Sequence, residues 1–486
     1  MFPAVKLLPL QSFTQRIRPI TTRAQTIYAL SSSPGKAGVA VIRISGSNAR
    51  QAITKMTLSP NIASPITDPR KAYFRRIRHP ESRQVLDRGL VLWFPGPHSF
   101  TGEDSVELHI HGGNAVVKSV LDALHQIKDF RMAEQGEFSR RAFDNDKLDL
   151  TELEGLADLL NAETEMQHRL ALRQAEGGLR KPYELWREQI IKCMATTEAV
   201  IDFGEDENIE DGVMDQVIQD VKHLYTSISS HLDDSRVGEI VRNGIQVAIV
   251  GPPNAGKSTL LNRLAKREAA IVSDVPGTTR DVVEVKLDLG GYPVVLCDTA
   301  GLRESTDLVE LEGIKRAKAR IDSSDIKICL LSLENQSACT SIDPLVRSVI
   351  DKDTYLVLNK DDVYNKNNLA QLITQIQEET GIKKVWAMSC STGQGLDTFI
   401  KQMIGILKSK FDSSIANPVL ITQARHREHL EDCVSYLEGF LNMPQEDIVL
   451  SAEELRQAAN ALGKITGRID VENVLDVLFG QFCIGK

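Results

Sequence analysis

The residues from Gly251 to Ser258 have the types and spacing of a phosphate-binding loop. They spell G-P-P-N-A-G-K-S, follow the apolar run Val247–Val250, and precede three leucines at helical spacing, Leu260, Leu261 and Leu264. A strand, a glycine loop and a helix form the context in which G-x-x-x-x-G-K-S binds phosphate. Backbone N–H groups of such a loop and of the helix N-terminus point at the phosphates. We therefore predict a nucleoside triphosphate site here.

Two side chains of this loop bring the chemistry that a triphosphate needs. Lys257 adds positive charge between the outer phosphates, and Ser258 offers a hydroxyl ligand for Mg²⁺. The residues of this segment that we predict to bind the nucleotide are Asn254, Ala255, Gly256, Lys257, Ser258 and Thr259.

Three further short motifs each follow an apolar run: Asp298–Gly301 (D-T-A-G), Asn359–Asp362 (N-K-D-D) and Ser389–Ser391 (S-C-S). Asp298, at a strand end, can hold the Mg²⁺ shell, and the N–H of Gly301 can sense the γ-phosphate. A carboxylate in the second motif can accept from the N1–H and the exocyclic amine of guanine, which adenine cannot match. We assign this nucleotide choice to Asp361. The tight turn of the third motif offers backbone N–H groups to the guanine O6.

With Thr278 and Thr279 between the loop and Asp298, the order and spacing of these segments resemble the five motifs of a Ras-like GTPase. The S-C-S of residues 389–391 departs from the usual S-A-K, which weakens the fifth motif but not the nucleotide assignment. The predicted nucleotide is GTP. Its further contacts are predicted at Thr278, Thr279, Asp298, Thr299, Ala300, Gly301, Asn359, Lys360, Asp361, Asp362, Ser389, Cys390 and Ser391.

The composition describes a globular protein of several domains. A chain of 486 residues suggests two to four domains, and 42% hydrophobic with 25% charged residues is typical of globular proteins. The net charge of −9 gives no global basic field for nucleic acid. Seven cysteines without a C-x-x-C pair indicate neither a zinc site nor a disulfide framework. No apolar run is long enough to span a bilayer.

The N-terminal segment, residues 1–24, has the composition of a mitochondrial transit peptide. It carries Lys6 and three arginines among Ser, Thr and Gln, and the first acidic residue of the chain is Asp68. A disordered basic tail of a cytosolic protein is the alternative, and a chloroplast address stays open. We expect folded structure from about Gln25.

Residues 25–145 are predicted to form a small α+β domain. Arg43 lies inside the apolar run 39–44, so it must be paired or must face a ligand. Alternation in the run 105–110 places Glu107, His109 and His111 on one face. From the spacing alone these residues are as well explained by structure as by function. The H-x-H pair invites a metal site, but no third ligand accompanies it.

Helical periodicity fills residues 146–239 and returns in 411–486, on either side of the GTPase segment 240–410. Such bracketing predicts one helical bundle into which an α/β domain is inserted. The acidic loop 204–212 is most simply solvated. The apolar C-terminus is a docked tail, in which Cys483 is expected to be inert.

Several further motifs, together with the inserted GTPase, resemble the MnmE (TrmE) family over nearly all of the chain after the leader. They are R-I-S-G (43–46), F-P-G-P-H-S-F-T-G-E-D (94–104), H-G-G (111–113), G-E-F-S (136–139), N-D-K-L-D-L (145–150) and the terminal F-C-I-G-K (482–486). The resemblance implies a GTPase that acts with an FAD-carrying flavoprotein of the MnmG (GidA) family on the wobble uridine of tRNA. The group added would be of the 5-carboxymethylaminomethyl or taurinomethyl type. The basic leader indicates a mitochondrial member of the family, located in the matrix.

The same resemblance implies ligands and site residues. The N-terminal domain would dimerise and bind 5-formyl- or methylene-tetrahydrofolate, with contacts from Arg43, Glu107, Lys147 and Lys486. GTPase domains would pair around K⁺, with K⁺ positions at Asn254, Ser273, Val275 and Thr278. Ser258 and Thr279 match the Mg²⁺ positions, and Glu310 matches the residue that positions water.

The residues themselves agree with part of this. Leu302 occupies the place of the water-orienting glutamine of Ras-like proteins, so another group must orient the water. No arginine finger is evident; K⁺ near the phosphates could supply the charge, and Asn254 could ligate it. Arg303 is the rival for that role. Two other functions stay open: a ribosome-assembly GTPase, which would need an RNA-binding module, and a scaffold that uses GTP only to dimerise.

Overall fold

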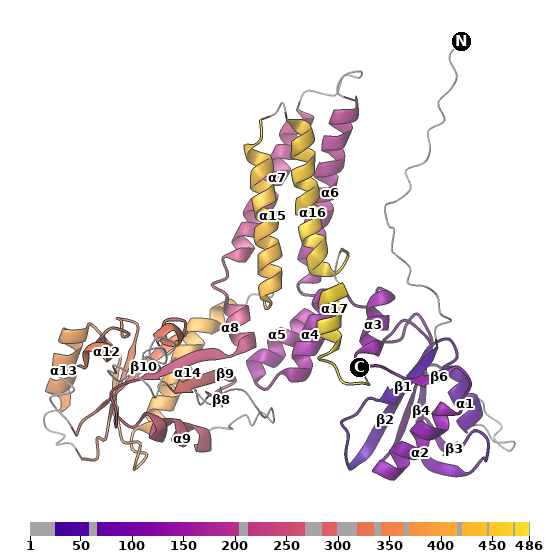
Figure 1. Cartoon of the computed structure of the whole chain (residues 1–486), viewed down its shortest axis with the longest axis horizontal. Helices are drawn as coiled ribbons and strands as arrows, with labels where there is room; N and C mark the ends of the chain where they lie inside the picture. The colour runs from indigo at the N-terminus through magenta and orange to yellow at the C-terminus, as the bar shows by residue number, and fades with distance from the viewer. Residues whose placement is uncertain are drawn as a thin grey trace, which may run out of the picture. The chain divides into compact units, whose positions relative to one another are not determined.

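The computed structural model describes residues 25–57, 66–203, 212–267, 284–298, 318–334, 342–363, 369–415, 420–444, 447–469 and 472–485. They belong to two compact units, drawn from residues 1–148 with 473–486 and from residues 149–472 (Figure 1). None of the helices in the described ranges is long and apolar enough to cross a membrane.

The first unit is built on a six-stranded sheet in the order β3-β4-β5-β2-β1-β6, in which only β1 and β6 pair in parallel. Two helices, α1 (Arg50–Thr57) and α2 (Asn114–His125), pack on one face of the sheet. A third, α3 (Glu137–Asp144), places Phe138 against the opposite face of β1. The strands are β1 (Thr26–Leu30), β2 (Ala37–Ser45), β3 (Tyr73–Arg78), β4 (Val85–Phe94), β5 (Ser105–Gly112) and β6 (Phe130–Met132).

The end of the chain belongs to this first unit. Helix α17 (Glu472–Phe479) brings Phe479 against Gly136, where a Cβ would lie 2.7 Å from the Phe479 carbonyl oxygen. The hydroxyl of Ser31 donates to the carbonyl of Gly485 at 2.9 Å. Residues 473–485 are therefore a tail docked on the N-terminal domain, whereas the sequence grouped them with the helical part. The domain boundaries drawn from the sequence otherwise stay predictions.

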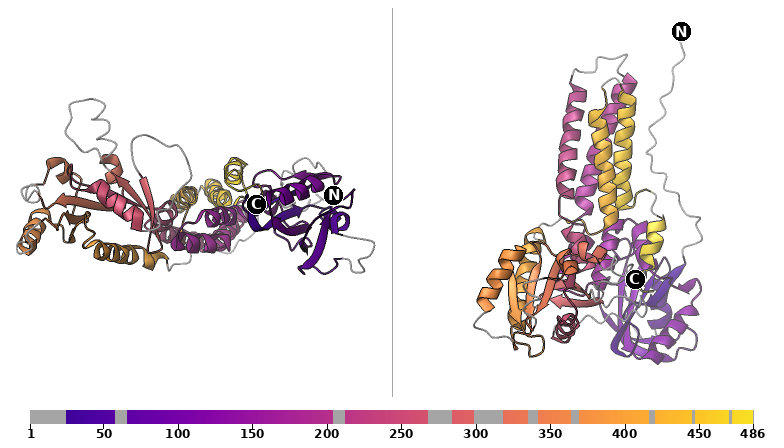
Figure 2. Two further views of the ribbon diagram at one scale, coloured as in Figure 1. Left: turned by 90° about the horizontal axis from the view of Figure 1, so that it is seen from below. Right: turned by 60° about the vertical axis from the view of Figure 1, so that its left-hand side comes forward.

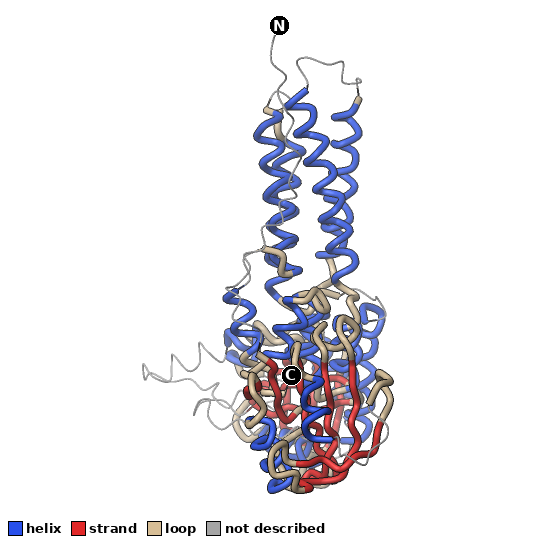
Figure 3. Tube along the Cα trace, turned by 90° about the vertical axis from the view of Figure 1, so that its right-hand side faces the viewer, coloured by secondary structure: helices blue, strands red, loops and turns tan. Residues whose placement is uncertain are grey.

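The second unit contains a bundle of four long helices, which run side by side in Figures 1 and 3. Its buried core joins α6 (Arg180–Phe203) and α7 (Val213–Leu232) to α15 (Ala424–Asn442) and α16 (Ile448–Thr466). Shorter helices α4 (Leu150–Asn161) and α5 (Glu165–Ala175) precede the bundle. Because the GTPase segment lies between α7 and α15 in the chain, the predicted insertion of an α/β domain into a helical bundle is confirmed.

The inserted domain is a doubly covered α/β sheet in the order β12-β11-β10-β7-β9-β8, parallel except for β8. Helices lie on both faces of the sheet (Figure 2). Buried side chains of the strands and helices form one core on each face. In such folds ligands bind beyond the carboxyl ends of the strands. The elements are α8 (Val237–Asn243), β7 (Ile245–Val250), α9 (Lys257–Arg267), β8 (Glu284–Leu289), β9 (Tyr292–Asp298), β10 (Ile326–Ser332), α12 (Pro344–Arg347), β11 (Tyr355–Asn359), α13 (Leu369–Thr380), β12 (Val385–Met388) and α14 (Leu396–Ile415).

Candidate functional site

The phosphate-binding loop joins the carboxyl end of β7 to the first residue of α9, as the sequence predicted. Three of its residues have positive φ: Gly251 at 152°, Asn254 at 61° and Gly256 at 104°. A Cβ on Gly256 would lie 2.1 Å from the Asn359 amide nitrogen. Glycine is therefore required at Gly256 both by its backbone conformation and by the close approach of a neighbouring strand end.

Asn359 holds the two ends of the nucleotide pocket together. Its side-chain Nδ2 donates to the carbonyl of Ala255 at 2.7 Å, and its Oδ1 accepts from the N–H of Cys390 at 2.9 Å. The side chain is 2% exposed, so both hydrogen bonds are shielded from water. From the sequence we predicted that Asn359 binds the nucleotide. The structure adds that it fixes the phosphate loop to the guanine-end loop.

Lys257 lies with its ammonium group on the phosphate loop. Nζ donates to the carbonyls of Gly251 at 2.7 Å and Pro252 at 3.0 Å. The ammonium group therefore lies beside the loop that is predicted to hold the phosphates. This position agrees with the role predicted for Lys257.

A cavity of about 600 Å³ extends from the phosphate loop to the loop after β12. Ten of the residues predicted to bind GTP line it: Asn254, Gly256, Lys257, Ser258, Thr259, Asn359, Lys360, Asp362, Cys390 and Ser391. Three lining residues had not been predicted, namely Pro253, Glu334 and Val363. Glu334 could have been found, because it lies two residues after the last residue of strand β10, Ser332, and so near the carboxyl edge of the sheet.

The two carboxylates of the N-K-D-D motif differ in position, and this corrects our choice of Asp361. Asp362 lines the cavity and accepts from the hydroxyl of Ser391 at 3.3 Å. Asp361 is 7% exposed and does not line the cavity; its N–H donates to the carbonyl of Met388. The geometry therefore favours Asp362 as the guanine acceptor.

Hydrogen bonds from neighbouring hydroxyl groups lower the pKa of Asp362. The hydroxyl of Ser389 is the main cause that lowers the pKa of Asp362, and the hydroxyl of Ser391 adds to it. An ionised carboxylate accepts at both oxygens, as guanine recognition requires. Cys390, between the two serines, is buried, and burial raises the pKa of its thiol to about 11. Cys390 is therefore a thiol, and its backbone N–H donates to Asn359 Oδ1.

The predicted residues around the γ-phosphate lie outside the described residues. They are Ser273, Val275, Thr278, Thr279, Thr299, Ala300, Gly301, Leu302, Arg303 and Glu310. Asp298 ends β9 opposite Ile249 of β7, so its backbone lies beside the start of the phosphate loop. Across the described ranges no group of three or more His, Cys, Asp or Glu side chains could hold a metal ion.

Arg43 and Glu107 form the second candidate site, on the sheet of the first unit. They are cross-strand partners in β2 and β5, and Arg43 Nε donates to Glu107 Oε1 at 3.3 Å. His109 Nε2 lies 3.3 Å from the other oxygen of Glu107. Both charged side chains are about one-fifth exposed, at 19% and 20%. The arginine inside an apolar run is thus paired and still accessible.

Aromatic side chains and Lys147 lie close to this pair. The Arg43 guanidinium is 5.1 Å from the centre of the Phe100 ring and 5.9 Å from that of Phe138. Two residues after Phe100, a Cβ on Gly102 would lie 3.3 Å from Cγ of Lys147. The loop 100–102 therefore contacts both Arg43 and Lys147. The fourth predicted folate residue, Lys486, lies outside the described residues.

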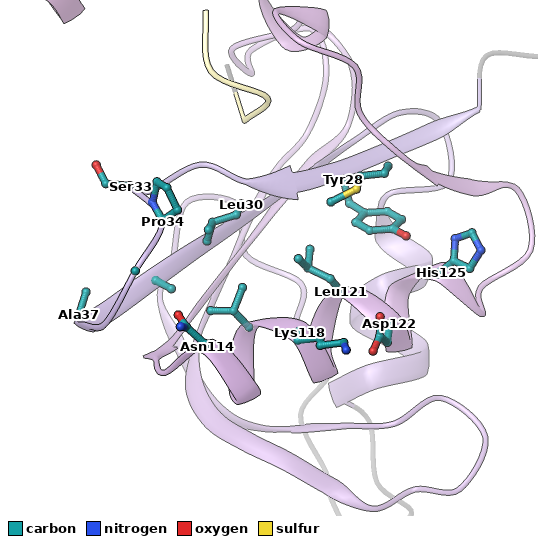
Figure 4. Close-up of a pocket in the computed structure, with 14 residues that line it drawn as sticks. Tyr28, Leu30, Ser33, Pro34, Ala37, Asn114, Lys118, Leu121, Asp122 and His125 are labelled. Atoms are coloured by element: carbon teal, nitrogen blue, oxygen red, sulfur yellow. The ribbon is translucent and has the colours of Figure 1, made fainter. Parts of the chain in front are cut away.

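A separate cavity of about 520 Å³ lies on the helix-covered face of the same sheet (Figure 4). Tyr28 and Leu30 from β1 line it, together with Lys118, Leu121 and Asp122 from α2. Arg43 and Glu107 point to the other face, since they alternate with the core residues Ile42 and Leu108. Of the predicted folate residues that the structure describes, Arg43, Glu107 and Lys147, none lines this cavity.

The strand–loop–helix, the Asn359 clamp and the Asp362 acceptor at the sheet's carboxyl edge define a P-loop GTPase of the Ras-like class. Two family models match the chain. The model described as the GTP-binding protein TrmE N-terminus matches residues 26–147, and the MnmE helical domain matches residues 150–483. The chain belongs to the MnmE (TrmE) family.

Curated relatives agree over nearly the whole length. A zebrafish (Danio rerio) protein named 5-taurinomethyluridine-tRNA synthase subunit GTPB3, mitochondrial, is 46% identical over 471 residues, covering 95% of this chain and 93% of that protein. A protein of Parvibaculum lavamentivorans named tRNA modification GTPase MnmE is 50% identical over 465 residues, covering 95% and 100%. The human (Homo sapiens) GTPB3 protein is 43% identical over 478 residues, covering 96% and 94%.

Proposed function

We propose that this protein is the GTP-hydrolysing subunit of a mitochondrial complex that modifies the wobble uridine of tRNA. The observation that supports this proposal most is that one chain contains both a guanine-nucleotide pocket and a domain with the accessible Arg43–Glu107 pair. Relatives named as taurinomethyluridine synthase subunits or tRNA modification GTPases match it along nearly its whole length. The mitochondrial relatives and the basic leader support placement in the matrix.

GTP is bound by two ends of the pocket. Asp362 accepts from the N1–H and amine of guanine. In the turn 389–391 the N–H of Ser389 donates to Gln394 and that of Cys390 to Asn359, so the N–H of Ser391 would donate to O6. Lys257 and the N–H groups at the start of α9 neutralise the outer phosphates. Asn359 keeps the two ends at a fixed distance through its hydrogen bonds to Ala255 and Cys390.

Hydrolysis needs charge compensation at the β- and γ-phosphates. Mg²⁺, held by Ser258 with Thr279, supplies it when bound. The Ser258 side chain lies in the cavity lining, which fits this role. We further propose that K⁺ binds Asn254, which is exposed and lines the nucleotide cavity. Ser273, Val275 and Thr278 would complete the K⁺ site, and Glu310 would orient the water.

The N-terminal domain would bind a reduced folate that supplies the carbon for modification. Its pterin ring has a donor edge like that of guanine, and Glu107 can accept from it. Arg43 and Lys147 supply positive charge, and the rings of Phe100 and Phe138 provide apolar surface beside Arg43. The residues present therefore fit a folate. Lys486 would contribute from the docked tail.

The assembly would be a homodimer that works with an FAD-carrying flavoprotein of the MnmG (GidA) kind and with tRNA. Folate and flavin chemistry together would build the aminomethyl group, while the GTPase domains pair across their nucleotides. The relatives' names support tRNA as the substrate. The homodimer and the flavoprotein partner are inferred from membership of the MnmE (TrmE) family.

The decisive experiment compares tRNA modification with GTP hydrolysis in the same variants. Arg43→Ala and Glu107→Ala should abolish the modified uridine in mitochondrial tRNA, measured by mass spectrometry of nucleosides, with GTP hydrolysis near normal. Losing one side of a charged contact should weaken 5-formyl-tetrahydrofolate binding by about 2–5 kcal/mol in calorimetry on the full-length protein. A wild-type protein that binds no folate would refute the carbon-transfer half and favour a ribosome-assembly GTPase.

A further inference from the structure

The face of the N-terminal sheet that α1 and α2 leave uncovered carries side chains in three successive rows. Strand pairing defines them. The first row holds Arg43, Glu107 and Leu92, the second Val41, His109, Leu90 and Phe74, and the third Arg88 and Arg76. Residues two apart in a strand point to the same face, and the intervening Val91 and Ile77 are buried in the core on the other face.

The third row places two like charges directly opposite each other. Arg76 in β3 pairs with Arg88 in β4, and both side chains are exposed. Like charges at directly opposed positions destabilise a strand pair. The nearest acid in the chain, Asp87, is hydrogen-bonded to His111, at 2.8 Å to its backbone N–H and 2.8 Å to its ring. An anion bound between the two guanidinium groups would relieve their repulsion.

The second row is an apolar step between two charged rows. Phe74 is 65% exposed and stands opposite Leu90, which is 40% exposed. An exposed aromatic and aliphatic pair on a sheet is a surface on which a planar ring can stack. The first row therefore holds an acid and a cation, the second row mainly apolar side chains, and the third row two cations.

We infer that the Arg76–Arg88 pair binds the glutamate tail of a reduced folate that carries more than one γ-linked glutamate. This inference rests on the proposed folate site. The pterin lies at Glu107 and Arg43, the aminobenzoate ring crosses Leu90 and Phe74, and the tail carboxylates reach the two arginines. Rows two residues apart are roughly 7 Å apart, so the cations lie about 14 Å along the strands from Glu107. A folate with a short glutamate chain can span that length.

The charges of the face favour this ligand over an RNA backbone. A polyphosphate chain crossing all three rows would meet the carboxylate of Glu107, whereas a folate presents donors there and carboxylates only at its far end. The two arginines also form a single cationic point at one end of the face. Arginine binds carboxylates in a bidentate manner, which suits a chain of glutamates.

The test compares two ligands on full-length protein by calorimetry: 5-formyl-tetrahydrofolate with one glutamate and with five. The wild type should bind the pentaglutamate roughly five- to twentyfold more tightly, the scale of two exposed charge pairs. The double variant Arg76→Gln/Arg88→Gln should bind both forms alike, with monoglutamate affinity changed less than threefold. Arg75→Gln is the matched control, since Arg75 lies in the same strand but stacks on Tyr73 at 5.2 Å. It should keep the tail preference.

The outcomes separate this inference from the folate site itself. A wild type without tail preference, or a double variant that keeps it, overturns the inference and leaves the folate site standing. A wild type that binds neither ligand overturns the folate site. If the double variant keeps its tail preference but loses tRNA binding or dimerisation, measured by filter binding and light scattering, the face serves RNA or a second copy instead. Unchanged GTP hydrolysis should accompany the expected result. The thermal unfolding temperature of the double variant should be no lower than that of the wild type, because the variant removes the opposed like charges.

Discussion

Asp361 and Asp362 are adjacent in the chain but lie in different environments. Asp362 lines the nucleotide cavity and accepts from Ser391, whereas Asp361 is buried, with Oδ1 unpaired among the described residues. The side chain that can meet guanine is therefore Asp362, while Asp361 lies near the loop after β12, with Gln394 Nε2 3.5 Å from its Oδ2.

Asp362→Asn should change the nucleotide preference of the protein from GTP to xanthosine triphosphate. An asparagine amide can donate to the extra carbonyl of xanthine but leaves a guanine donor unpaired. That loss should lower the affinity for GTP by roughly 30- to 150-fold. Titration of both nucleotides against the variant measures it. Asp361→Asn is the matched control and should keep its preference for GTP; a preference for xanthosine triphosphate in that variant instead would return the role to Asp361.

Asn359→Asp should weaken GTP binding by loosening the phosphate loop. The carboxylate can still accept from the Cys390 N–H, but it places an oxygen against the carbonyl oxygen of Ala255 instead of a donor. Leaving a buried carbonyl unpaired costs about 1–3 kcal/mol. Thermal unfolding of the GTPase domain and GTP titration measure the two effects. Wild-type stability and affinity in this variant would contradict the clamp.

Features of the site could be predicted from the sequence where they depend only on residues close together in the chain. The phosphate loop was predictable because its donors and its glycines lie within eight residues. The choice between Asp361 and Asp362 was not, because Lys360 has φ 68° directly after β11. A left-handed residue redirects the chain, so the alternation of side chains in the strand cannot be extended past it.

Other features could not be predicted from the sequence because they depend on packing between residues far apart in the chain. Helical periodicity grouped residues 411–486 with the helical bundle but could not reveal that Phe479 packs on Gly136 of the N-terminal domain. Alternation placed Glu107 and His109 on one face, and the structure confirmed this. The partner of Glu107 follows from the register of β2 on β5, which no local pattern specifies.

GTP hydrolysis should depend on K⁺ and on Glu310. Replacing K⁺ by Na⁺, or Glu310 by Ala, should lower turnover by roughly one to three orders of magnitude, the scale of one positioned charge or water-orienting group. GTP binding should survive both changes, which a fluorescent nucleotide titration checks. Arg303→Ala is the companion variant. If Glu310→Ala hydrolyses GTP at the wild-type rate while Arg303→Ala does not, the role passes to Arg303.

The burial of His231 predicts that the helical bundle loses stability at acidic pH. Its ring packs against those of Tyr183 and Trp186, with ring centres 5.8 Å and 5.4 Å away, and the Tyr183 hydroxyl is 3.2 Å from Nε2. Burial lowers the pKa of His231 from 6.5 to about 4. The unfolded chain therefore binds a proton that the folded chain does not. The stability contributed by neutral His231 is complete above pH 6.5 and is lost as the pH falls towards 4.

The opposite shift at Asp149 makes a variant comparison necessary. Burial raises the pKa of Asp149 from 3.8 to about 6, so this group favours the folded state at low pH and loses that effect as the pH rises through 6. The two contributions partly cancel in the wild type. His231→Gln keeps a hydrogen-bonding group for Tyr183 but cannot titrate, and Asp149 contributes equally to both proteins. Between pH 7 and pH 5, the free energy of unfolding of the wild type should therefore fall by about 1–2 kcal/mol relative to that of the variant, after allowance for partial solvent access. Urea unfolding at both pH values, followed by the helical circular dichroism signal, measures this difference. Parallel pH dependence in the two proteins would show that His231 is not held neutral in the bundle.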